Sequence, residues 1–340
     1  MKRLTTVLSG SLLVLAACGA LAQTPAASGT TTGTGTAGVL CDYSESTYNA
    51  DESVKATSTA KWACSTTERT LSANGIPDHE VGTFPNANNP NTISAQTVAA
   101  KFTLTPTKTD TATQLGGPRG NVAMMLNGVK ADPGTAGTCD DSGTNCDEGG
   151  GGTGQWRMEA LGQTSFNFGT DDNNALVQPG GAYHYHGMPE GLIKVLDTGK
   201  SETAMTLIGW AADGFPVYAR YGHTTATDAS SSLTAMKGSY QLKATPDANR
   251  PATTVYAMGT FQQDYQYVAG SGDLDECNGR TDVTPEFPND TYHYYATDSY
   301  PYLPRCVKGE VTTTQRLGGP PPQGSTAPAG SPTTTAPDGK

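Results

Sequence analysis

Histidine is scarce in this 340-residue chain, and two of its five histidines stand two residues apart, in Tyr183-His184-Tyr185-His186. Side chains at positions i and i+2 leave the same face of a β-strand. We therefore expect His184 and His186 to project together, with Tyr183 and Tyr185 packed on the opposite side. Two imidazoles at this spacing can place nitrogens on one ion. The pattern predicts half of a metal site, and a pair of half-buried, hydrogen-bonded histidines is the alternative.

A second segment, residues 291–295, repeats the pattern around His293, with Tyr295 where a second histidine would stand. The same alternation places His293 and Tyr295 on one face. We expect the two segments to face each other, so that three imidazoles share one ion. A carboxylate should complete or support the site, with Asp275 as the first choice and Asp213 as the second. Copper or zinc suits three imidazoles best.

Two other functions remain open for the same residues. In the first, the metal activates a water that Asp213 or Glu276 orients, and the protein is an extracellular hydrolase of an ester, a glycan or a peptide. In the second, the tyrosines and histidines form a hydrogen-bonded core, and the protein is a metal-free binding or adhesion module. An open coordination position in a pocket would distinguish the hydrolase from the metal-binding protein.

The remaining candidate residues carry weaker signals. His79 follows Pro77-Asp78 in a loop that could approach the site, and His223 beside a Thr/Ser-rich stretch is expected to be exposed. The acidic run 140–145 lacks the closing glutamate of a calcium loop. The chain has no phosphate-binding glycine loop, GxSxG turn or HExxH helix, which argues against a nucleotide enzyme. A formal net charge of −11 argues against nucleic acid as a partner.

Several motifs stand in a specific order along the chain. They are Asn74 to His79, Phe84 to Asn86, Gly181 to Gly187, Gly209 to Tyr218, Leu274 to Arg280, Thr291 to Tyr295 and Tyr300 to Tyr302. Together they resemble the YHYH domain family, a group of mostly bacterial exported proteins, over roughly Cys64 to Gly309. The resemblance implies export but not an activity. Related sequences often have a histidine just before Val177, where this chain has Leu176, which implies a poorer site if that histidine is a ligand.

The N-terminus predicts export from a bacterial cell. Residues 1–17 combine a short basic start with an apolar stretch too short to span a bilayer, as in a signal peptide. The sequence Leu15-Ala16-Ala17-Cys18 is typical of a lipobox, which predicts that Cys18 is acylated and that this lipid anchors the protein to a membrane. Ordinary cleavage after Ala22 is the alternative. We expect a cell-envelope location, at the outer membrane or on the periplasmic or extracellular face.

Six cysteines remain once Cys18 is set aside, and an even number in an exported chain indicates disulfides. Six cysteines allow 15 pairings. Their order along the chain favours three local loops, Cys41–Cys64, Cys139–Cys146 and Cys277–Cys306. No CxxC pair supports a zinc site instead.

The folded part is expected over residues 39–316, between a Thr/Gly/Ser-rich tether at 18–38 and a Pro/Gly/Thr tail at 317–340. Short β-branched and aromatic runs separated by Gly and Pro predict an all-β fold, a sandwich or barrel-like double sheet with long loops. The expected strands are Val98–Thr105, Asn121–Leu126, Thr206–Trp210, Val217–Tyr221, Thr254–Met258, Tyr265–Val268 and Thr291–Ala296.

Overall fold

The structure is a computed structural model, and it describes residues 36–117, 120–149, 152–201 and 203–311. The expected signal peptide at 1–17, the lipid site Cys18, the tether up to residue 35 and the tail at 317–340 lie outside the described residues. The fold is all-β, as predicted.

An eight-stranded sheet forms the centre of the fold, in the order β11-β12-β7-β6-β13-β14-β20-β19. Its strands are β6 (Ala123–Met125), β7 (Lys130–Ala131), β11 (Ala175–Val177), β12 (Tyr183–Tyr185), β13 (Thr206–Ala211), β14 (Pro216–Ala219), β19 (Gly279–Asp282) and β20 (Thr291–Ala296).

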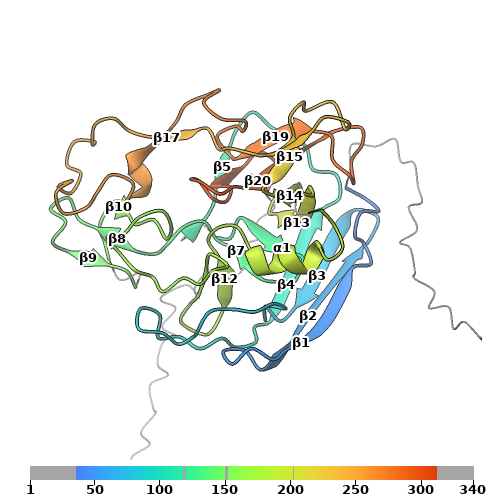
Figure 1. Cartoon of the computed structure of the whole chain (residues 1–340), viewed down its shortest axis with the longest axis horizontal. Coiled ribbons are helices and arrows are strands. Elements are labelled where there is room, and N and C mark those ends of the chain that lie inside the picture. Colours follow the sequence, from blue (N-terminus) through green and yellow to red (C-terminus); the bar gives the residue numbers. More distant parts are fainter. Residues whose placement is uncertain (1–35, 118–119, 150–151, 202, 312–340) are drawn as a thin grey trace, which may run out of the picture. The chain divides into compact units, whose positions relative to one another are not determined.

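A four-stranded antiparallel sheet precedes it in the chain and is coloured blue to cyan in Figure 1. Its strands, in spatial order, are β1 (Ser44–Asn49), β2 (Ala56–Cys64), β3 (Glu68–Ala73) and β4 (Val98–Thr103).

Smaller elements complete the described part. They are the pair β5 (Thr113–Gln114) and β21 (Cys306–Val307), the triplet β8 (Thr138–Cys139), β9 (Cys146–Asp147) and β10 (Trp156–Arg157), the pair β15 (Tyr221–His223) and β16 (Leu233–Ala235), the pair β17 (Tyr240–Leu242) and β18 (Tyr265–Tyr267), the helix α1 (Glu190–Leu196) and the 3-10 helix η2 (Gln262–Asp264). No helix among the described residues is long and apolar enough to cross a membrane.

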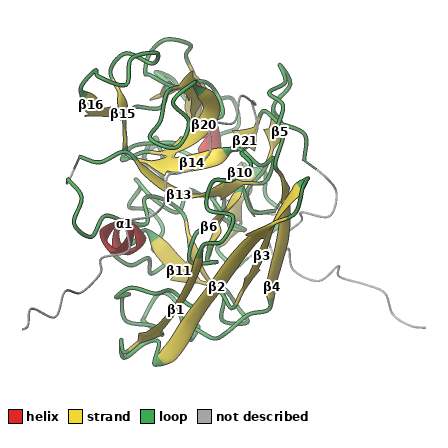
Figure 2. Ribbon diagram, turned by 90° about the vertical axis from the view of Figure 1, so that its right-hand side faces the viewer, coloured by secondary structure: helices red, strands yellow, loops and turns green. Residues whose placement is uncertain are grey.

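The two larger sheets pack face to face, which gives the expected double sheet (Figure 2). Trp62 and Phe102 of the smaller sheet share a buried cluster with Met124 and Trp210 of the larger one. The indole N–H of Trp62 also donates to the carbonyl of Leu126 at 2.9 Å. We call this side of the larger sheet the sandwich face. The other side, the loop face, is covered by loops and by α1, whose Leu192 is fully buried.

Most of the expected strands form, because β-branched and aromatic residues suit a half-buried pleated surface. Thr291–Ala296 coincides with β20, and Tyr265–Val268 with β18 to within one residue. The strand expected at Thr254–Met258 is wrong, since this segment is a series of turns in which Val255 is 66% exposed. Its β-branched residues have no sheet against which to pack.

The two halves of the larger sheet repeat each other about the central antiparallel pair of β6 and β13. Each half begins with an antiparallel hairpin, β6–β7 or β13–β14. Each continues with a second antiparallel hairpin, β11–β12 or β19–β20, whose last strand joins the first hairpin in parallel. The two Tyr-His-Tyr segments are therefore equivalent strands of a repeated unit.

The three expected disulfides are present: Cys41–Cys64, Cys139–Cys146 and Cys277–Cys306. The Cα atoms of the pairs lie 5.0, 4.1 and 4.9 Å apart. Each closes a local loop, which restricts the unfolded chain and thereby stabilises the native one.

Candidate functional site

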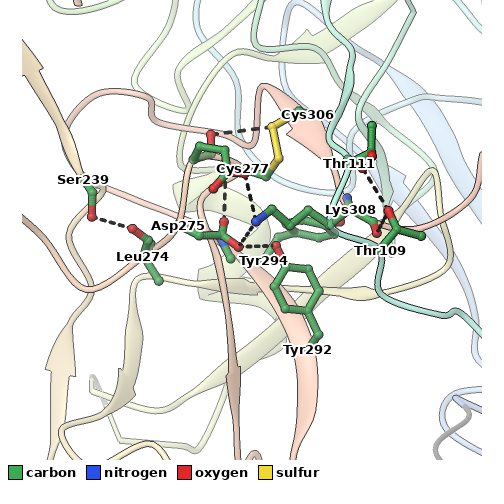
Figure 3. Close-up of polar contacts among 12 residues, drawn as sticks. Thr109, Thr111, Ser239, Leu274, Asp275, Cys277, Tyr292, Tyr294, Cys306 and Lys308 are labelled. Carbon is green, nitrogen blue, oxygen red and sulfur yellow. Dashed lines mark hydrogen bonds and ion pairs between the residues drawn. A yellow bond between two sulfur atoms is a disulfide. The ribbon is translucent and has the colours of Figure 1, made fainter. Parts of the chain in front are cut away.

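The tyrosines of the two Tyr-His-Tyr segments point to the loop face and are almost completely buried, as predicted. The Tyr183 hydroxyl donates to Asp171 Oδ2 at 2.7 Å, and the Tyr292 hydroxyl donates to Asp275 Oδ2 at 2.8 Å. Figure 3 shows the second of these pairs. A buried hydroxyl needs a partner, so these carboxylates hold the strands in place.

Each of these two carboxylates also builds the turn before the neighbouring strand in the same way. Asp171 Oδ1 accepts from the backbone N–H groups two and four residues ahead, at 2.9 and 3.1 Å. Asp275 Oδ1 does so at 3.0 and 3.0 Å. In both turns an asparagine three residues after the aspartate, Asn174 or Asn278, adopts positive φ, 54° or 61°. Asparagine tolerates this conformation better than most residues do.

The second tyrosine of each segment bonds to the turn of the first hairpin. Asn127 Nδ2 donates to the Tyr185 hydroxyl at 3.0 Å, and the Tyr294 hydroxyl donates to Asp213 Oδ2 at 2.5 Å. Asn127 and Asp213 occupy the same position of an Asx-Gly turn, and each accepts from the backbone N–H two residues ahead, at 3.1 and 3.2 Å. Glycine follows each at a positive φ of 78° or 91°, as a tight hairpin turn requires.

The expected convergence of three histidines on one ion is wrong. Four strands lie between β12, which carries His184, and β20, which carries His293. At about 4.8 Å per strand the two are roughly 24 Å apart along the sheet. Nor do the described residues contain any group of three or more His, Cys, Asp or Glu side chains that could hold a metal ion.

The carboxylates expected beside the histidines also lie elsewhere. Asp213 and Asp275 bond to tyrosines on the loop face, whereas His293 leaves β20 on the sandwich face. Burial raises the pKa of Asp213 to about 6, although Tyr294 and two backbone N–H groups donate to its carboxyl. Both aspartates hold the fold together, and the sheet separates them from the imidazoles.

His184 and His186 do project together, from the sandwich face of the larger sheet, next to its edge strand β11. Their ring centroids lie 4.6 Å apart, and each side chain is 2% exposed. Burial lowers the pKa of His184 well below its usual range, and His186 lowers it further. Burial, followed by the charge of Arg305, lowers the pKa of His186 to about 3. Both imidazoles are therefore neutral at physiological pH and can ligate a metal.

The hydrogen bonds of the two rings differ. Nδ1 of His184 lies 3.3 Å from the carbonyl of Ala182, which can only accept, so the tautomer protonated at Nδ1 makes this bond and leaves the lone pair on Nε2; the backbone of Leu176 is a second neighbour of the ring. Neither Nδ1 nor Nε2 of His186 makes a hydrogen bond of good geometry with a described residue; the nearby backbone of Asp132 raises its pKa only slightly against the effect of burial. A buried polar group without a partner costs about 1–3 kcal/mol, so His186 is a poor choice for a purely structural core residue.

The repeat supplies an internal comparison for His186. The equivalent residue of the second half is Tyr295, since the backbone N–H of each donates to an equivalent turn residue, Asn174 or Asn278. Tyr295 is buried too, but its hydroxyl donates to Asp282 Oδ2 at 3.1 Å. The same position of the fold is thus satisfied in one half and unsatisfied in the other.

His293 repeats the local geometry of His184. Its Nδ1 lies 3.0 Å from the carbonyl of Thr291, two residues upstream, and Nε2 is buried without a partner among the described residues. Burial lowers the pKa of His293 to about 3. Its neighbours on the sheet are the rings of Tyr218 and Tyr295, with centroids at 5.0 and 4.8 Å. His293 therefore has no second imidazole beside it.

The other two histidines have structural surroundings. His79 Nδ1 lies 2.8 Å from the carbonyl of Glu80, and Nε2 lies 2.6 Å from the Tyr185 hydroxyl, which places His79 on the loop face, away from His184. His223 is 8% exposed and bonds to the carbonyl of Ser231, so the expectation of an exposed side chain is wrong. The polar sequence around His223 does not indicate that this residue lies in a strand, β15, which pairs with β16.

Comparison with known proteins gives one match. No curated protein and no solved structure matches the chain. The family model described as YHYH protein matches residues 99–309, which include both hairpins of each half of the larger sheet. The match covers more than half of the 340 residues, and the chain belongs to the YHYH protein family.

Proposed function

We propose that this protein binds one copper ion, in the cuprous state, between His184 and His186. The observation that carries the proposal is the buried His186 imidazole, which has two unpartnered nitrogens beside a second neutral imidazole. An ion that accepts the lone pair of one His186 nitrogen would remove part of the cost of burying the ring. Nε2 of His184 is the natural second ligand, because its Nδ1–H is held by Ala182.

The number of ligands favours copper over zinc. Structural zinc sites use four protein ligands and catalytic zinc sites use three. The described residues offer two imidazoles here and no third His, Cys, Asp or Glu. Cuprous ion is stable with two ligands, and imidazole is among the ligands that suit copper.

The burial of the pair favours binding over hydrolysis. A hydrolytic metal site needs an open position that water and a substrate can reach. Both imidazoles are 2% exposed, and neither lines the cavities described in this fold. Burial also excludes water, which would hinder oxidation of a bound cuprous ion.

The proposed location is the cell envelope, with the chain held to a membrane by a lipid on Cys18. Three disulfides support an oxidising compartment. The lipobox around Cys18 and the uncharged stretch after it support the lipid anchor. In this location the protein would hold copper outside the cytoplasm.

The test is to load the exported protein with cuprous ion, without oxygen and without a reducing agent. The protein is then desalted and its metal content is measured. We expect one copper per chain, and no retained zinc when Zn²⁺ is supplied instead. His186→Tyr should lose the copper. Tyrosine is the residue at the equivalent position of the second half, where the fold buries it, so this variant removes the imidazole with a side chain that the repeated unit accepts there.

His223→Gln is the matched control, because it removes another buried histidine remote from the pair. It should retain one copper per chain. Circular dichroism should show that both variants fold. Wild-type protein without bound copper, or a folded His186→Tyr variant with a full copper, would overturn the proposal.

A further inference from the structure

A cavity of about 110 Å³ lies where β5, β10 and η2 come together, and neither His184 nor His186 lines it. Its floor consists of Gly116, Gly117 and Gly134, packed so closely that a Cβ added to Gly134 would lie 2.6 Å from the Gly117 nitrogen. Side chains larger than hydrogen at this position would push the two loops apart. The glycines therefore keep the loops in contact beneath the cavity.

Two arginines line this cavity, and their surroundings differ. Arg305 is buried and makes a bidentate ion pair with Glu159, at 2.9 and 2.8 Å. Arg157 is half-buried at the end of β10, and no described residue accepts a hydrogen bond from its guanidinium or forms an ion pair with it. One cation of the cavity is thus neutralised and the other is left available.

The carboxylates near the cavity are already engaged. Glu159 is held by Arg305, and Asp132 Oδ1 accepts from the backbone N–H groups of Gly117 and Gly134 at 2.6 and 3.1 Å. Neither forms an ion pair with Arg157. The chain has a net charge of −11, so the unpaired guanidinium of Arg157 makes this cavity positively charged in an otherwise negatively charged protein.

Apart from Leu115, the remaining lining residues are polar or aromatic. Gln114 and Gln262 contribute amides, and the rings of Tyr240 and Tyr300 meet edge to face with centroids 5.4 Å apart. A guanidinium presents parallel N–H groups that match the oxygens of a carboxylate or a phosphate. We propose that this cavity binds the oxyanion group of a small molecule, with Arg157 as its main ligand. The proposed ligands of this site are not those of the proposed copper site, although Arg305, which lines the cavity, also lowers the pKa of His186.

Isothermal titration of the exported protein with malonate and, separately, with inorganic phosphate tests the proposal. We expect saturable binding of one equivalent of at least one probe, and the two probes distinguish a carboxylate ligand from a phosphate ligand. Arg157→Gln should weaken the binding at least tenfold. Arg157→Lys should recover part of it, because lysine keeps the charge but loses the paired N–H geometry.

Arg220→Gln is the control for net charge, because Arg220 lies outside the cavity and pairs with Glu190 and Asp298. It should leave the affinity unchanged within about twofold. Absence of saturable binding for both probes, or equal affinity of the folded Arg157→Gln variant, would overturn the proposal. Copper content of the same samples keeps this result separate from the outcome at His186.

Discussion

His186 and Tyr295 occupy equivalent positions in the two halves of the eight-stranded sheet, and among the described residues the Tyr295 side chain has a hydrogen-bond partner of good geometry whereas the His186 side chain has none. The backbone environment is the same, since both N–H groups donate to the asparagine of an equivalent turn, at 2.7 and 2.9 Å. The difference therefore lies in the side chains at and around the two positions, since Asp282 faces Tyr295 and Arg305 acts on His186. A fold that accommodates a satisfied tyrosine in one half has no structural need for an unsatisfied imidazole in the other.

The buried histidines make stability sensitive to acid. Burial lowers the folded-state pKa values of His184, His186 and His293, those of the last two to about 3, from about 6.5 in the unfolded chain. The unfolded state then binds more protons below pH 6.5, so stability is fully present above that pH and falls as the pH decreases toward 3.

His186 and His293 should each contribute about 1.4 kcal/mol per pH unit in this window, and His184 should add to the loss in the same direction. Urea unfolding of the metal-free protein at pH 7, 6 and 5 measures the slope. His186→Tyr should reduce the slope by about 1.4 kcal/mol per pH unit. A free energy of unfolding that is flat between pH 7 and 5 would contradict the neutral, buried state of these rings.

The repeated tyrosine–aspartate pairs should be equivalent in energy. Tyr183→Phe and Tyr292→Phe each remove a donor to a carboxylate at the same position of the same turn. Each should lower the free energy of unfolding by about 1.5–3 kcal/mol, the usual range for a hydrogen bond to a charged group. Chemical denaturation checks both values. A large cost in one variant with none in the other would show that the two halves are not energetically alike.

A second copper site can be created in the second half. Tyr295→His places an imidazole beside His293, as His186 stands beside His184. The variant loses the bond to Asp282, so its free energy of unfolding should fall, but it should bind two cuprous ions per chain. Asp282 keeps its contact with Arg280. A folded variant that still binds one ion would show that two adjacent imidazoles in this strand geometry are insufficient.

The lipid anchor has its own test. Cys18 lies outside the described residues, and its acylation is inferred from the lipobox alone. Cys18→Ala should shift the exported protein from the detergent phase to the aqueous phase in a detergent-partition experiment, or stop its processing. Unchanged partition of the variant would remove the anchor from the proposal, and copper binding would be unaffected.

The sequence predicts local features of this fold well. The alternation of Tyr183-His184-Tyr185-His186 correctly places imidazoles on one face and tyrosines on the other, and loop closure correctly pairs Cys277 with Cys306. These features depend on residues close together in the chain. The relation between β12 and β20 depends instead on strand order, which alternation does not encode.

The repeat of the two halves could have been found from the sequence in part. Both Tyr-His-Tyr segments follow an aspartate with an asparagine three residues later, at Asp171 and at Asp275. The hydrogen bond from Tyr292 gives Asp275, the carboxylate expected at the metal, a structural role that Asp171 shares through Tyr183. The ligand chemistry of Asp275 alone suggests a metal ligand, whereas the aspartate–asparagine spacing that it shares with Asp171 indicates a structural role in a repeated turn.

X-ray absorption spectroscopy of the copper-loaded exported protein shows directly whether two histidines hold the ion. We expect a cuprous ion coordinated by two imidazole nitrogens, a signal that is lost in His186→Tyr and unchanged in His293→Gln. A first shell of three or more protein ligands that changes when His293 is replaced would contradict the two-histidine site, as would a copper signal that persists without His186.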